Sequence, residues 1–215
     1  MSREFEDILY AESDGVATIT INRPERMNAL RPQSYEEMIQ ALDEAAWNKS
    51  IGAIVLTGAG TKAFCIGGDN ADGKSERRGR GTIGVPIEYI HPMIRDAPKP
   101  VIARVNGYAI GGGNVLATLC DLTIAAESAQ FGQVGPKVGS VDPGFGTAYL
   151  ARLVGEKKAR EMWYLCRRYT AAEALAMGLI NAVVPDDELD AEVRRWCDEL
   201  VQRSPLAIEI GRAHV

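Results

Sequence analysis

The fold is decided by the stretch Asn106-Gly107-Tyr108-Ala109-Ile110-Gly111-Gly112-Gly113-Asn114. It directly follows the apolar run Val101-Ile102-Ala103-Arg104-Val105 and leads into a helical pattern that begins at Val115. A second glycine cluster, Phe64-Cys65-Ile66-Gly67-Gly68-Asp69, follows an earlier apolar run at 53–56. Each cluster therefore lies where a buried strand ends. Glycine at such a junction lets a ligand approach the backbone with no Cβ in the way.

These junctions also leave backbone N–H groups free to point at an oxygen atom. The helix that follows the second cluster adds partial positive charge at its N-terminus. Two such strand ends side by side would form an oxyanion hole from backbone donors alone. The alternative is that the glycines only form two tight turns at strand ends and have no role in function, because glycine often marks a turn.

The pattern along the chain indicates an α/β protein with parallel strands and crossover helices. Strands are predicted at 15–21, 52–57, 100–105, 122–126 and 180–184, and helices at 34–47, 87–95, 113–120, 147–154, 157–167, 187–202 and 206–215. We expect an α/β core over 1–150 and a mainly helical part over 151–215. Thr170 and Glu173 form a capping-box pattern. The last helical pattern has no end signal, so we expect the chain to be part of a longer protein.

Composition excludes several classes of function. The 215 residues carry a net charge of −5, which argues against nucleic acid as a partner. The four cysteines are widely spaced, which is typical of reduced core thiols and predicts a cytoplasmic protein. We expect no membrane association, because there is neither a signal-peptide pattern nor an apolar stretch of spanning length. With only two histidines, a histidine-based metal site is not expected.

Together with the segments Asn22-Arg23-Pro24-Glu25-Arg26-Met27-Asn28-Ala29-Leu30 and Phe131-Gly132-Gln133, the two glycine clusters resemble the crotonase (enoyl-CoA hydratase/isomerase) superfamily. The resemblance implies a spiral of ββα units with a helical C-terminal region, assembled as a homotrimer or a dimer of trimers. It implies an acyl-CoA thioester as substrate and no tightly bound cofactor. The thioester oxygen would lie between the N–H groups of Gly68 and Gly112.

The same resemblance assigns the residues that bind the substrate. Those expected to contact CoA or the acyl group are Arg26, Ala29, Ile66, Gly67, Asp69, Asn70, Tyr108, Ala109, Ile110, Gly111 and Val134. Arg26 would face a phosphate, although a solvated loop arginine explains it equally well. Hydratases of the superfamily carry two glutamates, which correspond to Val115 and Gly135 here. Neither residue can transfer a proton, so simple hydration of an enoyl-CoA is not expected.

A loop offers different chemistry in their place. Ser140 and Asp142 lie in a glycine-bounded segment, Gly139-Ser140-Val141-Asp142-Pro143-Gly144. A hydroxyl and a carboxylate at this spacing can orient a substrate oxygen and move a proton. A loop that caps the following helix is the alternative without function.

Segments 79–86, 111–118 and 131–137 are similar to those of hydrolases that open the ring of 2-ketocyclohexanecarboxyl-CoA. The Ser140–Asp142 loop and the segments 155–161 and 163–167 are also similar to 1,4-dihydroxy-2-naphthoyl-CoA synthases, some of which recruit bicarbonate. That similarity would place a bicarbonate or water pocket at Gln133, Val134 and Gly135. A dehalogenase-like enzyme with Asp142 as nucleophile, or a non-catalytic binding protein, are the further alternatives.

Overall fold

Strands of two sheets form the centre of the protein. The computed structural model describes residues 5–69, 81, 84–140 and 146–214. The larger sheet contains β1 (Ile8–Ser13), β2 (Val16–Ile21), β3 (Ala53–Gly58), β5 (Val101–Val105), β7 (Leu122–Ala126) and β10 (Ala182–Val184), in that order. The smaller sheet contains β4 (Ala63–Cys65), β6 (Tyr108–Ile110), β8 (Gln130–Gly132) and β9 (Arg168–Thr170). Only the pairs β1–β2 and β8–β9 are antiparallel among these described strands.

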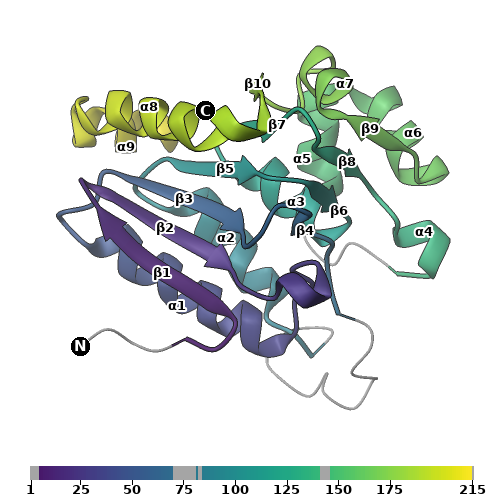
Figure 1. The fold of residues 1–215 in the computed structure, drawn as a ribbon, viewed down its shortest axis with the longest axis horizontal. Coiled ribbons are helices and arrows are strands. Elements are labelled where there is room, and N and C mark those ends of the chain that lie inside the picture. Colours follow the sequence, from purple (N-terminus) through teal and green to yellow (C-terminus); the bar gives the residue numbers. More distant parts are fainter. Residues whose placement is uncertain (1–4, 70–80, 82–83, 141–145, 215) are drawn as a thin grey trace.

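The chain builds these sheets by repeating one unit. It passes from the larger sheet to the smaller and then into a helix as β3-β4-α2 (Ile87–Asp96), β5-β6-α3 (Gly112–Leu119) and β7-β8-α4 (Gly135–Val138). This repetition confirms the predicted spiral of ββα units (Figure 1). The other helices are η1 (Pro24–Arg26), α1 (Pro32–Trp47), α5 (Gly146–Val154), α6 (Glu156–Leu165), α7 (Ala171–Ala176), η2 (Asp186–Glu188), α8 (Leu189–Val201) and α9 (Pro205–Arg212).

The larger sheet is covered on both faces because its central strands are apolar on both. Along β3, Ala53 and Val55 pack in a cluster with Leu189 and Val193 of α8. Its alternate residues, represented by Leu56, belong to the main core. This alternation follows from the two-residue period of a strand, and Figure 1 places α1 and α8 on opposite sides of the sheet.

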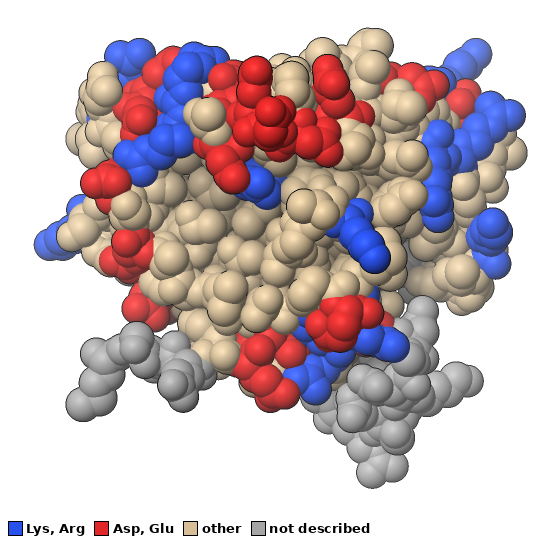
Figure 2. Space-filling view, in the orientation of Figure 1, with Lys and Arg blue, Asp and Glu red and all other residues tan. Residues whose placement is uncertain are grey.

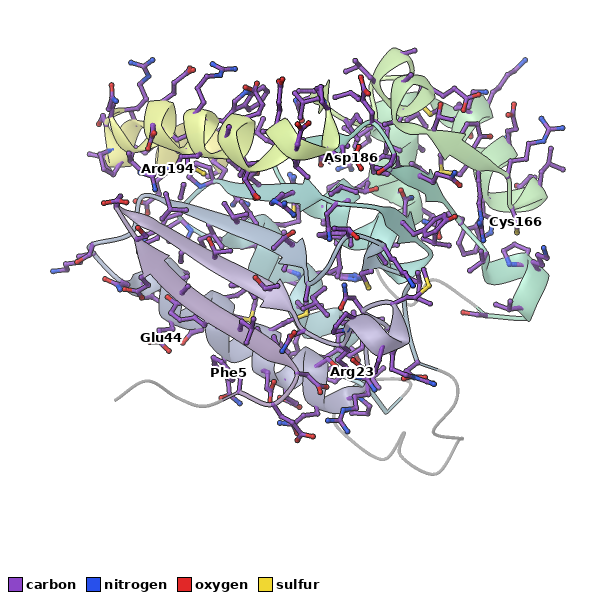
Figure 3. All side chains as sticks on the ribbon, viewed as in Figure 1. Phe5, Arg23, Glu44, Cys166, Asp186 and Arg194 are labelled. Carbon is purple, nitrogen blue, oxygen red and sulfur yellow. The ribbon has the colours of Figure 1, made fainter. Side chains whose placement is uncertain are left out.

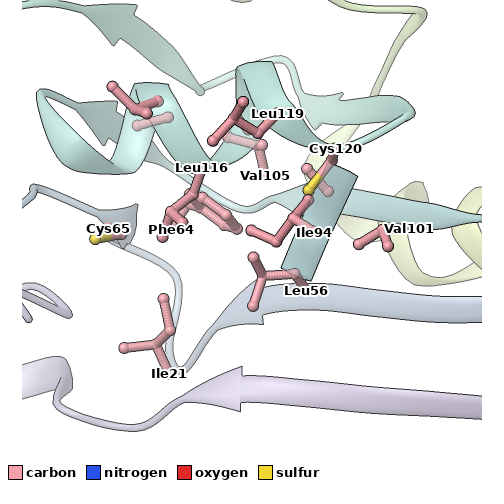
Figure 4. Packing of buried hydrophobic residues seen from close by; sticks show 14 of the residues in the cluster. Ile21, Leu56, Phe64, Cys65, Ile94, Val101, Val105, Leu116, Leu119 and Cys120 are labelled. Carbon is pink, nitrogen blue, oxygen red and sulfur yellow. The ribbon is translucent and has the colours of Figure 1, made fainter. Parts of the chain in front are cut away.

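The main core joins the elements that carry the two glycine clusters. Leu56 of β3, Phe64 of β4, Ile94 of α2 and Leu116 of α3 pack together and are at most 1% exposed (Figure 4). Burial of each such side chain contributes about 1.5–3 kcal/mol to folding. The strand ends at the glycine clusters are therefore fixed to one shared core.

The part of the chain after residue 150 is mostly helical, but it also adds an edge strand to each sheet. β9 pairs with β8 and β10 pairs with β7; β9 was not predicted. The predicted helix 157–167 ends two residues earlier than expected, at Leu165, because Cys166 has a left-handed φ of 49°. The capping box at Thr170 and Glu173 is confirmed.

The surface over η2 and α8 is acidic. Figure 2 shows acidic side chains gathered along this side of the molecule, where the first turns contribute Asp186, Asp187, Glu188, Asp190 and Glu192. In the described ranges, none of the helices is both long and apolar enough to span a bilayer.

Candidate active site

Three parallel strand ends meet at one edge of the smaller sheet. The register pairs Cys65 of β4 with Ala109 of β6, and Ile110 of β6 with Gly132 of β8. The segments that follow these strands, 66–69, 111–113 and 133–135, therefore leave the sheet at the same edge. Ligands of α/β proteins commonly bind at the carboxyl ends of parallel strands.

The two glycine clusters come into direct contact at this edge. A Cβ on Gly67 would lie 2.8 Å from the Gly112 amide nitrogen, and a Cβ on Gly112 would lie 3.1 Å from Gly67 Cα and 3.9 Å from the Gly68 nitrogen. Gly67 also has a φ of +90°, which disfavours any residue with a Cβ. Glycine at these positions allows the amides of Gly68 and Gly112 to lie beside each other.

Both amides point away from the protein's own acceptors. Leu30 N–H donates to Gly67 C=O at 2.8 Å, and Leu30 C=O accepts from Asp69 N–H at 2.8 Å. Because these bonds flank Gly68, its own N–H faces the side opposite Leu30. Gly112 is the first residue of α3, so its N–H lacks an intrahelical acceptor and lies at the positive end of the helix. Neither N–H finds a protein acceptor in the described part of the chain.

The two positions at which the resemblance would place glutamates, 115 and 135, hold no proton donor. Val115 is 4% exposed and belongs to the main core. At Gly135 a Cβ would lie 2.7 Å from Cη2 of Trp163 and 2.9 Å from the Ser140 carbonyl oxygen. The indole of Trp163, on α6, therefore fills the space that a side chain at position 135 would need. The sequence pattern gave Trp163 no role, because only the packing of α6 on α4 brings it to the site.

The remaining predicted pocket residues continue from the glycines along the same edge. Val134 Cγ2 lies 3.3 Å from the position of a Cβ on Gly111. Ser140, which is exposed, donates its N–H to Gly135 C=O at 2.9 Å. Gln133 is only 3% exposed. Asp142 and Asn70 lie outside the described residues.

Arg26 and Asp69 form an ion pair beside the glycines. Arg26 Nη2 lies 2.8 Å from Asp69 Oδ1, and its Nε donates to Oδ2 at 3.2 Å. Arg23 Nη1 lies 3.1 Å from the same Oδ2. The Asp69 side chain is only 3% exposed, whereas that of Arg26 is 42% exposed. Of this pair, Arg26 thus presents the larger surface to a ligand. Arg23, labelled in Figure 3, is a site residue that sequence reasoning missed.

A second buried carboxylate lies behind this ion pair. Asp7 Oδ1 lies 3.7 Å from Arg23 Nε, while Asp7 Oδ2 accepts from Arg31 Nε at 2.8 Å and from the Ser34 hydroxyl at 2.6 Å. Burial raises the pKa of Asp7, but the hydrogen bonds from Arg31 and Ser34 and the charges of Arg31 and Arg23 outweigh burial and lower it. Asp7 is therefore a stable anion that supports Arg23 and Arg31.

Asn28 fixes the segment that carries Arg26. It is fully buried and has a left-handed φ of 56°, a conformation that asparagine tolerates better than most residues. Its Oδ1 accepts from Arg23 N–H at 3.0 Å, and its Nδ2 donates to the carbonyls of Ala59 at 3.0 Å and Ala63 at 2.7 Å. The side chain thus links segment 23–29 to the loop before β4. A lone asparagine in a turn-like segment was the only sequence signal for this role.

The other predicted substrate contacts are distributed around the edge. Ala29 and Ile110 are 5% exposed, Ala109 is fully buried in the main core, and Ile66 and Tyr108 are partly exposed. The ring of Tyr108 lies under the Arg168 guanidinium, 5.2 Å from its centroid. Within the described ranges, no cluster of histidine, cysteine, aspartate or glutamate could hold a metal ion.

Known proteins share this architecture. The family model described as enoyl-CoA hydratase/isomerase matches residues 11–215. An enoyl-CoA hydratase from Bacillus anthracis is 33% identical, with a TM-score of 0.88 over 97% of this chain and 81% of its own. An enoyl-CoA hydratase/carnithine racemase from Magnetospirillum magneticum is also 33% identical, with a TM-score of 0.89 over 98% of this chain and 80% of its own. The chain belongs to the enoyl-CoA hydratase/isomerase family, that is, to the crotonase superfamily.

Proposed function

We propose that this protein is an acyl-CoA enzyme that opens a cyclic β-ketoacyl-CoA by adding water, converting 2-ketocyclohexanecarboxyl-CoA to pimeloyl-CoA. The proposal rests on two features that occur together at one edge of the smaller sheet. Within the described ranges the amides of Gly68 and Gly112 lie together and meet no protein acceptor, whereas positions 115 and 135 provide no acid or base. This combination supports chemistry that forms a thioester enolate over hydration of a double bond.

The reaction we propose begins with the thioester oxygen bound by the two amides. Water adds to the ring ketone carbon, with Asp142 accepting its proton and Ser140 aligning the oxygen. The tetrahedral adduct collapses, the bond between the former ketone carbon and the α-carbon breaks, and its electron pair passes into the thioester as an enolate. Protonation of the α-carbon then releases the carboxylate product. Backbone donors that meet the enolate oxygen lower such a barrier by about 2.7–4 kcal/mol each.

The family supports the acyl-CoA part of this proposal. The solved relatives include proteins named enoyl-CoA hydratases, and both glycine clusters of this chain lie at the paired strand ends. The departure from hydration is supported by Trp163, whose indole leaves no room for a glutamate at position 135 unless the ring moves.

The buried Gln133 amide supports an additional ligand. We propose that a water molecule or a bicarbonate ion binds at Gln133, Val134 and Gly135, where the polar Gln133 side chain is almost fully buried. Turnover measured in carbon-dioxide-depleted buffer, with bicarbonate then added back, separates the two ligands. A rise in kcat on addition indicates bicarbonate, and an unchanged kcat indicates water.

We also propose that the protein assembles as a homotrimer or a dimer of trimers. The family likeness supports this assembly, and exposed apolar side chains such as Leu206 and Ile210 on α9 offer contact surface. Sedimentation velocity on the full chain gives the test. A monomer at micromolar concentration would contradict the proposed assembly without affecting the proposed chemistry.

The reaction is tested by incubating the protein with 2-ketocyclohexanecarboxyl-CoA and following the product by mass. Gain of one water, to give pimeloyl-CoA, is expected. The variant Asp142→Asn should lower kcat by about 10²–10⁴, as loss of a general base does. Ring closure of o-succinylbenzoyl-CoA with loss of water would instead identify a naphthoate synthase. Rapid hydration of crotonyl-CoA would identify a simple hydratase and overturn the proposal.

A further inference from the structure

We infer that Asp69 is a positioning residue that holds the Gly68 amide at the angle at which it meets the thioester oxygen. The inference rests on the proposed acyl-CoA function, because it concerns the same pair of amides. Asp69 follows Gly68 directly, so a restraint on its main chain and its side chain also restrains the Gly68 peptide. Both restraints are present.

The main-chain restraint comes from Leu30. Its N–H and C=O bond to Gly67 C=O and Asp69 N–H, each at 2.8 Å, and so hold the residues on both sides of Gly68. Gly67 and Gly68 have no Cβ and would otherwise sample many backbone conformations. A Cβ on Gly68 would meet nothing within 4 Å, so no side chain packs against the open side of this residue. The hydrogen bonds to Leu30 therefore contribute to the orientation of the Gly68 amide.

The side-chain restraint comes from two arginines. Arg26 makes two hydrogen bonds to the Asp69 carboxylate, at 2.8 and 3.2 Å, and Arg23 Nη1 lies 3.1 Å from it. Arg23 is itself immobilised, because Nη1 also donates to Ala29 C=O and Nε lies near Asp7. A planar guanidinium that meets a carboxylate through two bonds fixes direction as well as distance. The carboxylate thus ties Gly68 to segment 23–30.

If only its charge acted, the Asp69 carboxylate would disfavour binding of the enolate. An anion beside an oxyanion site opposes the negative charge that develops there. Arg23 and Arg26 compensate the charge of Asp69, and what remains is its effect on orientation. The two roles predict opposite results when the charge is removed. Loss of a repelling charge would favour the enolate, whereas loss of the restraint would disfavour it.

The test uses Asp69→Asn, which keeps the shape of the side chain and removes its charge. Acetoacetyl-CoA is the probe, since its bound enolate is read directly by near-ultraviolet absorbance without any turnover. At fixed pH we expect the fraction of bound probe present as enolate to fall about tenfold. The dissociation constant of CoA should change by less than about twofold, and kcat on the substrate should fall while KM stays nearly constant.

Two further variants separate positioning from general loss of structure. Asp121→Asn breaks an ion pair of similar kind, between Arg212 Nε and Asp121 Oδ2 at 2.8 Å, just beyond the opposite end of α3. It should lower stability and leave the enolate fraction unchanged. Arg26→Gln removes one of the two arginines from Asp69 and keeps Arg23 in place. It should lower the enolate fraction by about threefold, between the wild type and Asp69→Asn.

Each remaining outcome contradicts the inference in a distinct way. A larger enolate fraction in Asp69→Asn would show that Asp69 acts through its repelling charge. An unchanged fraction would show that Asp69 has no effect on the enolate. Weaker CoA binding with an unchanged enolate fraction would make Asp69 a ligand contact instead. If Asp69→Asn does not fold, an unchanged fraction in Arg26→Gln overturns the inference. A wild-type protein that binds no acetoacetyl-CoA would overturn the proposed function as well.

Discussion

The Gly112 amide nitrogen lies 2.8 Å from the place that a Cβ on Gly67 would occupy. The two strand ends therefore approach as closely as backbone allows, and a methyl group at Gly67 would push them apart. Gly68, one residue later, has open space at the equivalent position. Adjacent glycines thus differ sharply in what they tolerate.

We expect Gly67→Ala to reduce kcat by about 10²–10³, because it displaces one of two oxyanion donors. Alanine at the left-handed φ of +90° should also be strained, which should lower the free energy of unfolding by about 1–3 kcal/mol. Gly68→Ala is the matched control, with activity and stability within about twofold and 0.5 kcal/mol of the wild type. Steady-state kinetics and urea unfolding give both quantities. Equal effects of the two substitutions would contradict the geometry.

Gly135→Ala should be destabilising because its Cβ would lie 2.7 Å from Trp163 Cη2. We expect a cost of about 1–3 kcal/mol, as for other overpacked sites. In a Trp163→Leu background the same change should cost about 1 kcal/mol less, since the obstructing ring is gone. Part of the cost should remain, because the Ser140 carbonyl lies 2.9 Å away. Additive effects in this double-mutant cycle would contradict the contact.

The glycine clusters could be predicted from the sequence because their signal is local. An apolar run, a glycine pair and a helical pattern follow one another within a few residues, and the observed β5 and α3 begin and end within one residue of the prediction. The amides of Gly68 and Gly112 were paired through the resemblance, and the parallel register of β4 and β6 provides the physical reason.

Contacts between distant segments could not be predicted in this way. The strands β4, β6, β8 and β9 have three residues each, too few to display a period. The Arg23–Asp69 ion pair and the indole of Trp163 over Gly135 depend on how separate elements dock. Arginine, aspartate and tryptophan in these segments carry no pattern that identifies their partners.

Acid should destabilise the protein partly through Asp7. Its pKa lies below the ordinary value of 3.8, because the hydrogen bonds and charges of Arg31, Ser34 and Arg23 overcome burial. A lowered pKa contributes stability above the unfolded-state pKa, and that stability is lost as the pH falls through the folded-state pKa. Asp7→Asn should cost about 3 kcal/mol at neutral pH, as for a broken buried ion pair.

The difference between wild type and Asp7→Asn should shrink below about pH 4, where the Asp7 carboxyl of the unfolded chain begins to take up a proton, and it should be lost as the pH falls through the lower folded-state pKa. Urea unfolding of both proteins at neutral and acidic pH measures this difference in the free energy of unfolding. Asp190→Asn is the control, because Asp190 also pairs with an arginine but is 83% exposed. A difference that stays constant down to the acid transition would contradict the assignment.

Thiol reactivity should be confined to Cys166. Burial raises the pKa of Cys65 to about 12 and that of Cys197 to about 11, and it also raises the pKa of Cys120. A raised pKa keeps a thiol protonated at pH 8, and the thiolate is the reactive form. Cys166 alone is partly exposed. Iodoacetamide should add one label to the native protein, and Cys166→Ser should remove it; labelling of a second site before unfolding would contradict this.

Arg212 should be required to dock α9. Its guanidinium donates to Asp121 Oδ2 at 2.8 Å and to the carbonyls of Ile94, Arg95 and Ala97 at the end of α2. Lysine cannot reproduce this planar set of donors, so Arg212→Lys should cost about 1.5–3 kcal/mol. Because α9 would then open more often, trypsin should cleave faster after Arg203. Arg195→Lys, in exposed pairs on α8, is the control; equal cleavage rates in the two variants would mean that α9 is held by its other contacts.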